Sequence, residues 1–188
     1  MIDFKPLHGV TLDDLNRVAP GYTSTEKYVV SKTERDDHVV LTLALTPLEV
    51  PYIKQYAHDE DLVQHYSQVV KSGHSWGAYA GKTMVALAIV EHQHWNNTVN
   101  VWEFHVAPDY RGQQIGRGLM EKAVDSAQNV GARVMVFETQ NTNVPAIRFY
   151  RRMGFEVDAV DLSFYTNHDV SDGEVAVFMK RKLSASHE

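Results

Sequence analysis

The chain contains no cysteine among its 188 residues, and this absence excludes several kinds of chemistry. Disulfide bonds, thiolate metal sites and a cysteine nucleophile are all ruled out. The sequence also lacks an apolar run long enough to span a bilayer, and residues 1–6 do not have the pattern of a signal peptide. We therefore expect a cytoplasmic protein with no membrane partner.

An excess of basic residues is missing as well. The 18 Lys and Arg residues are outnumbered by 24 Asp and Glu residues, so the formal net charge is −6. This balance argues against a nucleic-acid partner and mildly favours a cationic ligand, although it is also an ordinary surface charge for solubility. Because no linker or repeat divides the chain, we expect a single domain over residues 1–188, as a monomer or a homodimer.

The first part of the chain, residues 1–74, is irregular in pattern, and we interpret it as a variable N-terminal half. Here we expect a helix capped by Thr11 and ended by Pro20-Gly21, and later a helix over 59–70 closed by Gly73. Between them we expect strands at 28–31 and 39–45, a charged turn or mobile loop at 33–38, and breaks in the chain at Pro47 and Pro51.

Residues 75–183 have a regular alternation of elements and form the expected core of the domain. Strands are predicted at 76–80, 84–90 and up to 106, joined by tight turns at Gly81-Lys82 and Asn96-Asn97. A helix to Val130, a buried strand at 134–137, a short helix between Asn143 and Gly154, and strands at 155–160 and 175–180 follow. The strand–helix–strand unit implies a parallel pair, so the fold class is mixed α/β with a largely antiparallel sheet.

Residues 101–120 form the stretch on which our interpretation of the rest of the chain depends. Alternation over 101–106 predicts a strand with Trp102 and Phe104 in the core and Glu103 and His105 on the other face. From Ile115 the apolar spacing becomes helical, so residues 111–118 lie at a helix N-terminus. The first N–H groups of a helix have no intrahelical partner, and glycines 112, 116 and 118 permit close approach, which favours binding of a pyrophosphate.

The spacing of its residues distinguishes this stretch from two known kinds of phosphate-binding loop. The stretch lacks the Lys-Ser or Lys-Thr pair of a Walker loop and the glycine spacing of a dinucleotide fingerprint. It resembles motif A of the GNAT superfamily of acetyl-CoA-dependent N-acetyltransferases, with Arg111 first, Gly116 as the second glycine, and Gln114 where the family has its first glycine. The resemblance implies that acetyl-CoA is held by Phe104, His105, Val106, Arg111, Gly112, Gln113, Gln114, Ile115, Gly116, Arg117 and Gly118.

A second stretch strengthens the resemblance. Asn143, Ala146 and Phe149-Tyr150, followed by Gly154-Phe155, are similar to the GNAT motif B. The resemblance implies that Asn143 and Ala146 contact the pantetheine arm and that Tyr150 is the general acid on the departing thiolate. It also implies a GNAT-type fold, with a mixed, mostly antiparallel sheet of about six to seven strands, a splayed central parallel pair and flanking helices.

The C-terminal half resembles the streptothricin acetyltransferases more narrowly, at residues 138–140, 143–146, Asp161, Tyr165, Asn167 and 174–176. This resemblance implies transfer of an acetyl group to a primary amine of a small, cationic antibiotic. Two alternatives stay open: a peptide or protein N-acetyltransferase, and a non-catalytic acyl-CoA-binding sensor, because a fold does not guarantee activity. Without a cysteine to carry an acyl group, we expect direct transfer in a ternary complex.

Amine acetylation requires a base, because a primary amine of pKa about 10.4 is mostly protonated at neutral pH. Glu103 is the candidate, beside the phosphate loop, and a structural ion pair is the equal alternative. His105 either relays a proton or lines the sheet, and Glu138 is a further candidate base. The backbone amides of residues 104–106 are placed to polarise the thioester carbonyl.

Aromatic and acidic side chains suggest an acceptor pocket with cation–π attraction for an ammonium group. The candidates, which are equally interpretable as packing and rim residues, are Trp95, Tyr66, Glu138, Asp158, Asp161 and Tyr165. His92 and His94 have a spacing compatible with metal binding, but no acid cluster nearby completes a site. We therefore interpret them as lining a turn and expect no metal.

Overall fold

The computed structural model describes residues 1–183, and the chain forms two compact units. Of the described residues, the first comprises 1–20, 55–137 and 181–183, and the second comprises 21–54 and 138–180. The strands form a seven-stranded sheet in the order β1-β4-β5-β6-β7-β9-β8 and a two-stranded sheet, β2-β3. The expected mixed α/β sheet is confirmed, whereas the single domain and its division at residue 74 stay predictions.

In the first unit, an antiparallel meander precedes a parallel pair. Its strands are β1 (Ile2–Pro6), β4 (Trp76–Ala80), β5 (Thr83–Gln93), β6 (Thr98–Val106) and the first part of β7 (Val134–Gln140). Neighbours from β1 to β6 pair antiparallel, and β6 pairs in parallel with β7 over Thr98–Val101. The predicted hairpin turns and the parallel pair predicted from the strand–helix–strand unit are confirmed. The strand β1 was not predicted.

Helices pack on the sheet of the first unit. The helix α3 (Ile115–Asn129) contacts β1, β4, β5 and β6, and buries the predicted apolar face: Ile115, Leu119, Met120, Ala123, Val124 and Ala127. The helices α1 (Leu12–Val18) and α2 (Glu60–Val69), with the 3-10 turn η1 (Val70–Ser72), pack with Leu87 and Ile89 of β5 in a separate cluster. Since side chains alternate along β5, α3 covers the opposite face.

The helix ends follow the predicted capping chemistry. Thr11 Oγ1 accepts a hydrogen bond from Asp14 N at 3.1 Å, and the Asp14 carboxylate accepts one from Thr11 N at 3.2 Å, which forms a capping box at α1. Asp59 Oδ1 accepts a hydrogen bond from Leu62 N at 2.8 Å and so caps α2, and Gly73 follows η1 with a φ of 81°. Among residues 1–183, the chain has no helix with the length and apolar content needed to cross a membrane.

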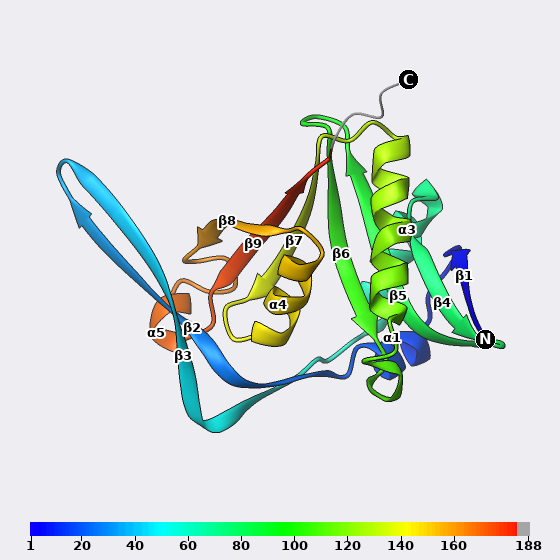
Figure 1. The fold of residues 1–188 in the computed structure, drawn as a ribbon, viewed down its shortest axis with the longest axis horizontal. Coiled ribbons are helices and arrows are strands. Elements are labelled where there is room, and N and C mark those ends of the chain that lie inside the picture. Colours follow the sequence, from blue (N-terminus) through cyan, green and yellow to red (C-terminus); the bar gives the residue numbers. More distant parts are fainter. Residues whose placement is uncertain (184–188) are drawn as a thin grey trace. The chain divides into compact units, whose positions relative to one another are not determined.

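The second unit contains a long two-stranded ribbon, the blue and cyan hairpin in Figure 1, formed by β2 (Gly21–Arg35) and β3 (His38–Gln55). The turn expected at 33–38 is present but shorter than predicted, whereas the breaks predicted at Pro47 and Pro51 were wrong, because β3 continues through both prolines. A two-stranded ribbon leaves one side of each strand without a partner, so a proline that lacks an N–H is tolerated there. The turn shrinks to Asp36 and Asp37.

The rest of the second unit consists of α4 (Val144–Arg152), β8 (Glu156–Asp161), the short α5 (Asp169–Asp172) and β9 (Ala176–Lys182). Helix α4 packs against β2. Its buried side chains are Val144, Ile147 and Tyr150, and Phe149 is half-buried.

Candidate active site

The loop before α3 leaves the N-terminus of that helix without a side-chain cap. After the 3-10 turn η2 (Pro108–Tyr110), residues 111–114 lead into α3, and the first intrahelical bond runs from Gly118 N to Gln114 O at 3.1 Å. No side chain of the described residues caps this end, and its first turn contains no acidic residue. The N–H groups of the first turn and the helix dipole therefore favour an anion.

Gln114 adopts a left-handed backbone conformation, which is usual for glycine. Its φ is +64° and its ψ is 1°, and together with Gly112, whose φ is +75°, it turns the chain into the helix. A left-handed conformation costs a residue with a Cβ atom roughly 1–2 kcal/mol. The substitution therefore preserves the loop's path and its backbone amides at the cost of strain.

The glycines of this loop have different roles. A Cβ atom on Gly112 would meet nothing within 4 Å, whereas one on Gly118 would lie 2.7 Å from the ring of Phe4 in β1. The need for glycine at position 118 therefore comes from the packing of β1 under α3. The prediction that all three glycines, including Gly116, admit the anion stays a prediction.

Three side chains in the loop or at the start of α3 form hydrogen bonds or an ion pair with neighbouring residues. Arg111 Nε donates to Val106 O at 3.0 Å, and Gln113 Nε2 donates to Asp109 O at 2.9 Å. Arg117 pairs with Glu121 one turn later at 2.9 Å. The bond from Arg111 ties the loop directly to the end of β6, where Glu103 and His105 lie.

A β-bulge changes the predicted register of β6. Glu103 pairs with Ile89 and Val101 pairs with Val90, so Trp102 is the extra residue on its strand. Trp102 is 43% exposed, donates from Nε1 to Glu91 and packs edge-on against the ring of His65. The prediction that Trp102 fills the core was wrong, because simple alternation does not extend through a bulge.

Phe104 kept part of its expected environment. Its ring lies 5.8 Å from that of Phe137 in β7, in an edge-on arrangement. Its neighbour Val106 accepts the bond from Arg111 and ends the strand beside Pro108. Phe104 therefore packs against the parallel strand β7 through Phe137.

Glu103 lies in a hydrogen-bonded cluster with a tyrosine of α2 and a histidine of its own strand. Tyr66 Oη donates to Glu103 Oε1, and His105 Nε2 lies against Glu103 Oε2, both at 2.5 Å. The side chains of His105 and Glu103 are 19% and 17% exposed. We call Tyr66, Glu103 and His105 the Glu103 cluster.

The charge of Glu103 is stabilised by its neighbours. Burial alone would raise the pKa of Glu103, but His105, the Tyr66 hydroxyl and His58 together lower this pKa below its ordinary value. Burial and the adjacent carboxylate raise the pKa of Tyr66, so its hydroxyl remains a donor. Glu103 is therefore held as a carboxylate with both oxygens engaged.

The segment before α2, which contains Tyr56 and His58, lies next to the Glu103 cluster. His58 Nε2 lies 2.8 Å from Ala19 O, and its buried Nδ1 has no hydrogen-bond partner among the described residues. The ring of Tyr56 packs edge-on against His105 at 5.8 Å. Sequence reasoning missed both residues, because no local pattern shows that this irregular segment approaches β6.

The motif B residues lie in the second unit. Asn143 caps α4, with its Oδ1 accepting a bond from Ala146 N at 3.3 Å. Tyr150 is only 7% exposed and packs against the rings of Phe149 and Phe155. The capping role of Asn143 engages the backbone of Ala146, while the cofactor contacts and the acid role stay predictions.

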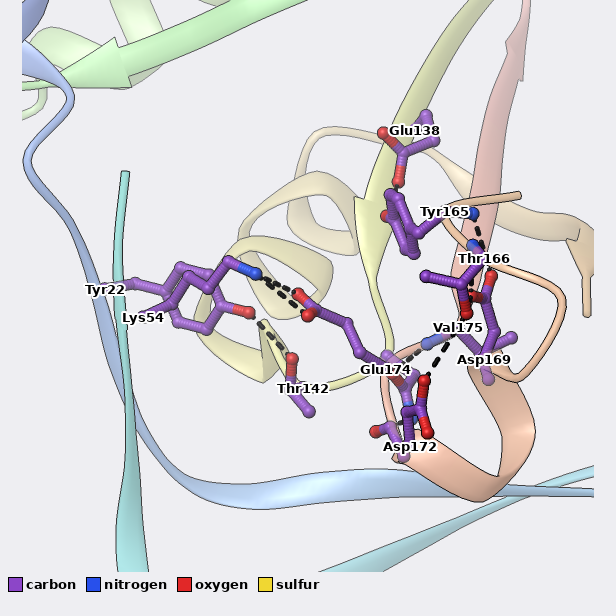
Figure 2. A network of polar contacts seen from close by, with 12 residues as sticks. Tyr22, Lys54, Glu138, Thr142, Tyr165, Thr166, Asp169, Asp172, Glu174 and Val175 are labelled. Carbon is purple, nitrogen blue, oxygen red and sulfur yellow. Dashed lines mark hydrogen bonds and ion pairs between the residues drawn. The ribbon is translucent and has the colours of Figure 1, made fainter. Parts of the chain in front are cut away.

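Of the expected acceptor residues, Glu138 and Tyr165 are brought together, and Figure 2 shows them pointing toward each other. The Tyr165 hydroxyl donates to Glu138 Oε1, and burial together with this carboxylate raises the pKa of Tyr165. The backbone N–H groups of Tyr165 and Thr166 donate to Asp169, at 2.9 and 2.6 Å. Asp169 thus holds the loop that presents Tyr165.

Further polar contacts connect segments of the second unit. Lys54 Nζ lies 2.8 Å from both oxygens of Glu174, and Tyr22 Oη lies 2.7 Å from Thr142 Oγ1 (Figure 2). These bonds join the β2–β3 ribbon to the segments on either side of α4 and α5. Sequence reasoning missed them, because the residues are far apart along the chain.

The other expected acceptor residues lie apart. Trp95 is 84% exposed in the turn before β6, at the far end of that strand from Glu103 and Tyr66. Asp158 pairs with Lys180, and Asp161 Oδ1 accepts from Ser163 N at 3.0 Å. The first unit therefore does not bring Trp95 to Tyr66.

The histidines at the end of β5 line a turn, as interpreted from the sequence. His92 Nε2 lies 2.8 Å from Asn97 Oδ1, and its ring lies 4.4 Å from that of His94. Burial lowers the pKa of the nearby His74, and His92 and His94 lower it further. Among residues 1–183, no three or more His, Asp or Glu side chains are arranged to hold a metal ion.

Comparison with known proteins agrees with this geometry. The model of the acetyltransferase (GNAT) family matches residues 38–155, which include both the loop before α3 and helix α4. Streptothricin acetyltransferase A of Bacillus subtilis (strain 168) is 30% identical over 133 residues, which is 71% of this chain and 75% of that protein.

Two further similarities extend the comparison. Streptothricin acetyltransferase of Streptomyces lavendulae is 40% identical over 96 residues, or 51% of this chain, and the match spans only 50% of that protein's length. The crystal structure of nourseothricin acetyltransferase superposes with a TM-score of 0.73 at 28% identity, covering 97% of this chain and 99% of the other. The chain belongs to the acetyltransferase (GNAT) family.

Proposed function

We propose that the protein transfers an acetyl group from acetyl-CoA to a primary amine of a small cationic molecule, by direct attack in a ternary complex. The observation that carries this proposal is the uncapped N-terminus of α3, tied through Arg111 to the strand end that holds the Glu103 cluster. An anion-binding helix end and a proton-accepting group on the adjoining strand are the two parts that the reaction needs.

The donor occupies the loop before α3 in this proposal. The N–H groups of residues 112–117 bind the pyrophosphate, and the backbone amides of residues 104–106 polarise the thioester carbonyl. Asn143 and Ala146 contact the pantetheine arm, and Tyr150 protonates the departing thiolate. The residues present fit an anionic donor because the first turn of α3 contains no acidic residue.

The proposed acceptor class rests on the relatives. Two relatives are named as streptothricin acetyltransferases, and the likeness to nourseothricin acetyltransferase covers nearly the whole chain. Glu138, paired with Tyr165, supplies a carboxylate for a cationic group of the acceptor. We therefore propose a cationic antibiotic of streptothricin type as the acceptor, in a cytoplasmic enzyme.

The test is a thiol-release assay with acetyl-CoA and a panel of amines at equal concentration. We expect release to depend on the amine, to be fastest with small polycationic amines, and to produce an N-acetyl product of matching amount. Fastest thiol release with peptides that carry a free N-terminal amine would favour a peptide acetyltransferase. Donor binding without release by any amine would contradict catalysis and favour a sensor.

The donor site is tested by thermal stability. Acetyl-CoA should raise the melting temperature by mass action, desulfo-CoA should do nearly as well, and NADH and ATP much less. Gly116→Val should abolish this shift by blocking approach to the loop, whereas Gly9→Val, at an exposed glycine with open space around it, should retain it. Equal stabilisation by ATP would identify a general nucleotide site instead.

A further inference from the structure

The Glu103 cluster holds two groups able to accept a proton, and their hydrogen bonds distinguish them. Both carboxylate oxygens of Glu103 are engaged, Oε1 by the Tyr66 hydroxyl and Oε2 by His105 Nε2. Protonation of Glu103 would remove the negative charge that strengthens both of these hydrogen bonds. His105 engages only one of its two ring nitrogens in a hydrogen bond to the described residues.

We propose that His105 Nδ1 accepts the proton of the attacking amine, and that Glu103 and Tyr66 are positioning residues for His105. This inference rests on the proposed function. It differs from the expectation drawn from the sequence, in which Glu103 is the candidate base and His105 either relays a proton or lines the sheet.

The hydrogen bond to Glu103 selects the useful tautomer of His105. When Nε2 carries the hydrogen and donates it to the carboxylate, the lone pair of a neutral imidazole lies on Nδ1. The same carboxylate stabilises the imidazolium that forms when Nδ1 takes a proton. The Tyr56 ring packed against His105 and the Tyr66 hydroxyl bonded to Glu103 fix the orientation of the pair.

The step balances in atoms and charge. The neutral amine nitrogen attacks the thioester carbonyl carbon, a C–N bond forms, and the nitrogen loses one proton to Nδ1. The C–S bond then breaks, and the thiolate takes one proton from an acid or from solvent. The imidazolium of His105 returns its proton to solvent, so the products are the acetylated amine and the free thiol.

Several titratable groups surround the pair and enter its pH dependence. His58, from the segment before α2, favours the Glu103 anion when protonated. His65 of α2 lies 5.5 Å from the Tyr66 ring. The groups that face the pair are Tyr56, His58, His65 and Tyr66, so any shift in the pH profile must be measured against variants of the pair itself.

The test compares kcat and the pH profile of kcat/KM for the wild type, His105→Gln, Glu103→Gln and the double variant. We expect His105→Gln to lower kcat by about 10²- to 10⁴-fold, the range of a positioned general base. The double variant should be no slower than His105→Gln, because the two residues act as a unit. Glu103→Gln should move the acid limb to lower pH, because the imidazolium loses its carboxylate.

Acetyl-CoA-induced thermal stabilisation checks that each variant is folded and binds the donor, and His105→Asn replaces His105→Gln if that variant does not fold. Wild-type kcat and an unchanged acid limb in the histidine variant, together with loss of activity in Glu103→Gln, would overturn the inference and make Glu103 the direct base. Failure of the wild type with every amine would instead contradict the proposed function.

Discussion

Glu103 in β6 and Glu138 in β7 each accept a hydrogen bond from a tyrosine hydroxyl, but the two tyrosines are held differently. Tyr66 lies on the buried face of helix α2, and the second oxygen of Glu103 contacts His105. Tyr165 lies in the loop before α5, whose backbone is held by Asp169. One pair is joined to a histidine near the loop before α3, and the other belongs to a surface loop.

The comparison shows that a tyrosine–carboxylate pair does not by itself identify a base. What distinguishes Glu103 is a hydrogen-bonded histidine on its own strand and a strand end linked to the loop before α3 through Arg111. In the proposed function, Glu138 instead supplies a carboxylate for a cationic acceptor. The two pairs should therefore respond differently to the same substitutions.

The largest difference should follow loss of each carboxylate. Glu103→Gln should lower the rate by up to about 10⁴-fold at neutral pH with nearly unchanged acetyl-CoA affinity, because it removes the carboxylate that orients His105. Glu138→Gln should raise the KM of a cationic acceptor by no more than about fivefold, because exposed charge pairs contribute about 0–1 kcal/mol. Steady-state kinetics measures both, and equal losses of kcat would erase the distinction.

Loss of each tyrosine hydroxyl should have smaller effects in the same order. Tyr66→Phe removes the donor to Glu103 Oε1, so the pKa of Glu103 should rise and kcat should fall several-fold. Tyr165→Phe should change the acceptor KM and leave kcat nearly constant. If Tyr165→Phe lowered kcat more than Tyr66→Phe, Glu138 would become the better candidate for the base.

The smallest effect concerns stability in acid. The folded pKa of Glu103 lies below its unfolded value, so its stabilising contribution is present above the unfolded pKa and is lost as pH falls through the folded pKa. Denaturant unfolding at about pH 7 and about pH 3 should show a stability cost of Glu103→Gln that shrinks in acid.

Asp169 provides the matched case in the other unit. Burial alone would raise the pKa of Asp169, but bonds from Tyr165 and Thr166 lower it, so Asp169→Asn should follow the same trend as Glu103→Gln. A cost that grows as pH falls, at either position, would contradict the assigned direction of the pKa shift.

Local patterns predicted much of this arrangement. The cap at Thr11, the helix from Ile115 and the cap at Asn143 depend on neighbours in sequence, and all three are confirmed. The glycine-rich loop was placed correctly as well, although Gln114 stands in a left-handed position. These features form from interactions within a few residues.

Features that depend on distant residues were not predicted. The bulge at Trp102 arises from pairing with β5, and the bond from Tyr66 to Glu103 joins a helix to a strand in another part of the sequence. The continuous strand through Pro47 depends on its having only one partner strand. Periodicity carries no information about which residue a side chain meets across the fold.

A crystal structure of the protein with acetyl-CoA tests the central claim most directly. The account predicts that the pyrophosphate accepts hydrogen bonds from N–H groups of residues 112–117, and that the thioester lies beside the end of β6, within reach of an amine bound against His105 and Glu103. A donor bound elsewhere, or one whose thioester lies away from His105, would contradict the assignment of these two elements to one active site.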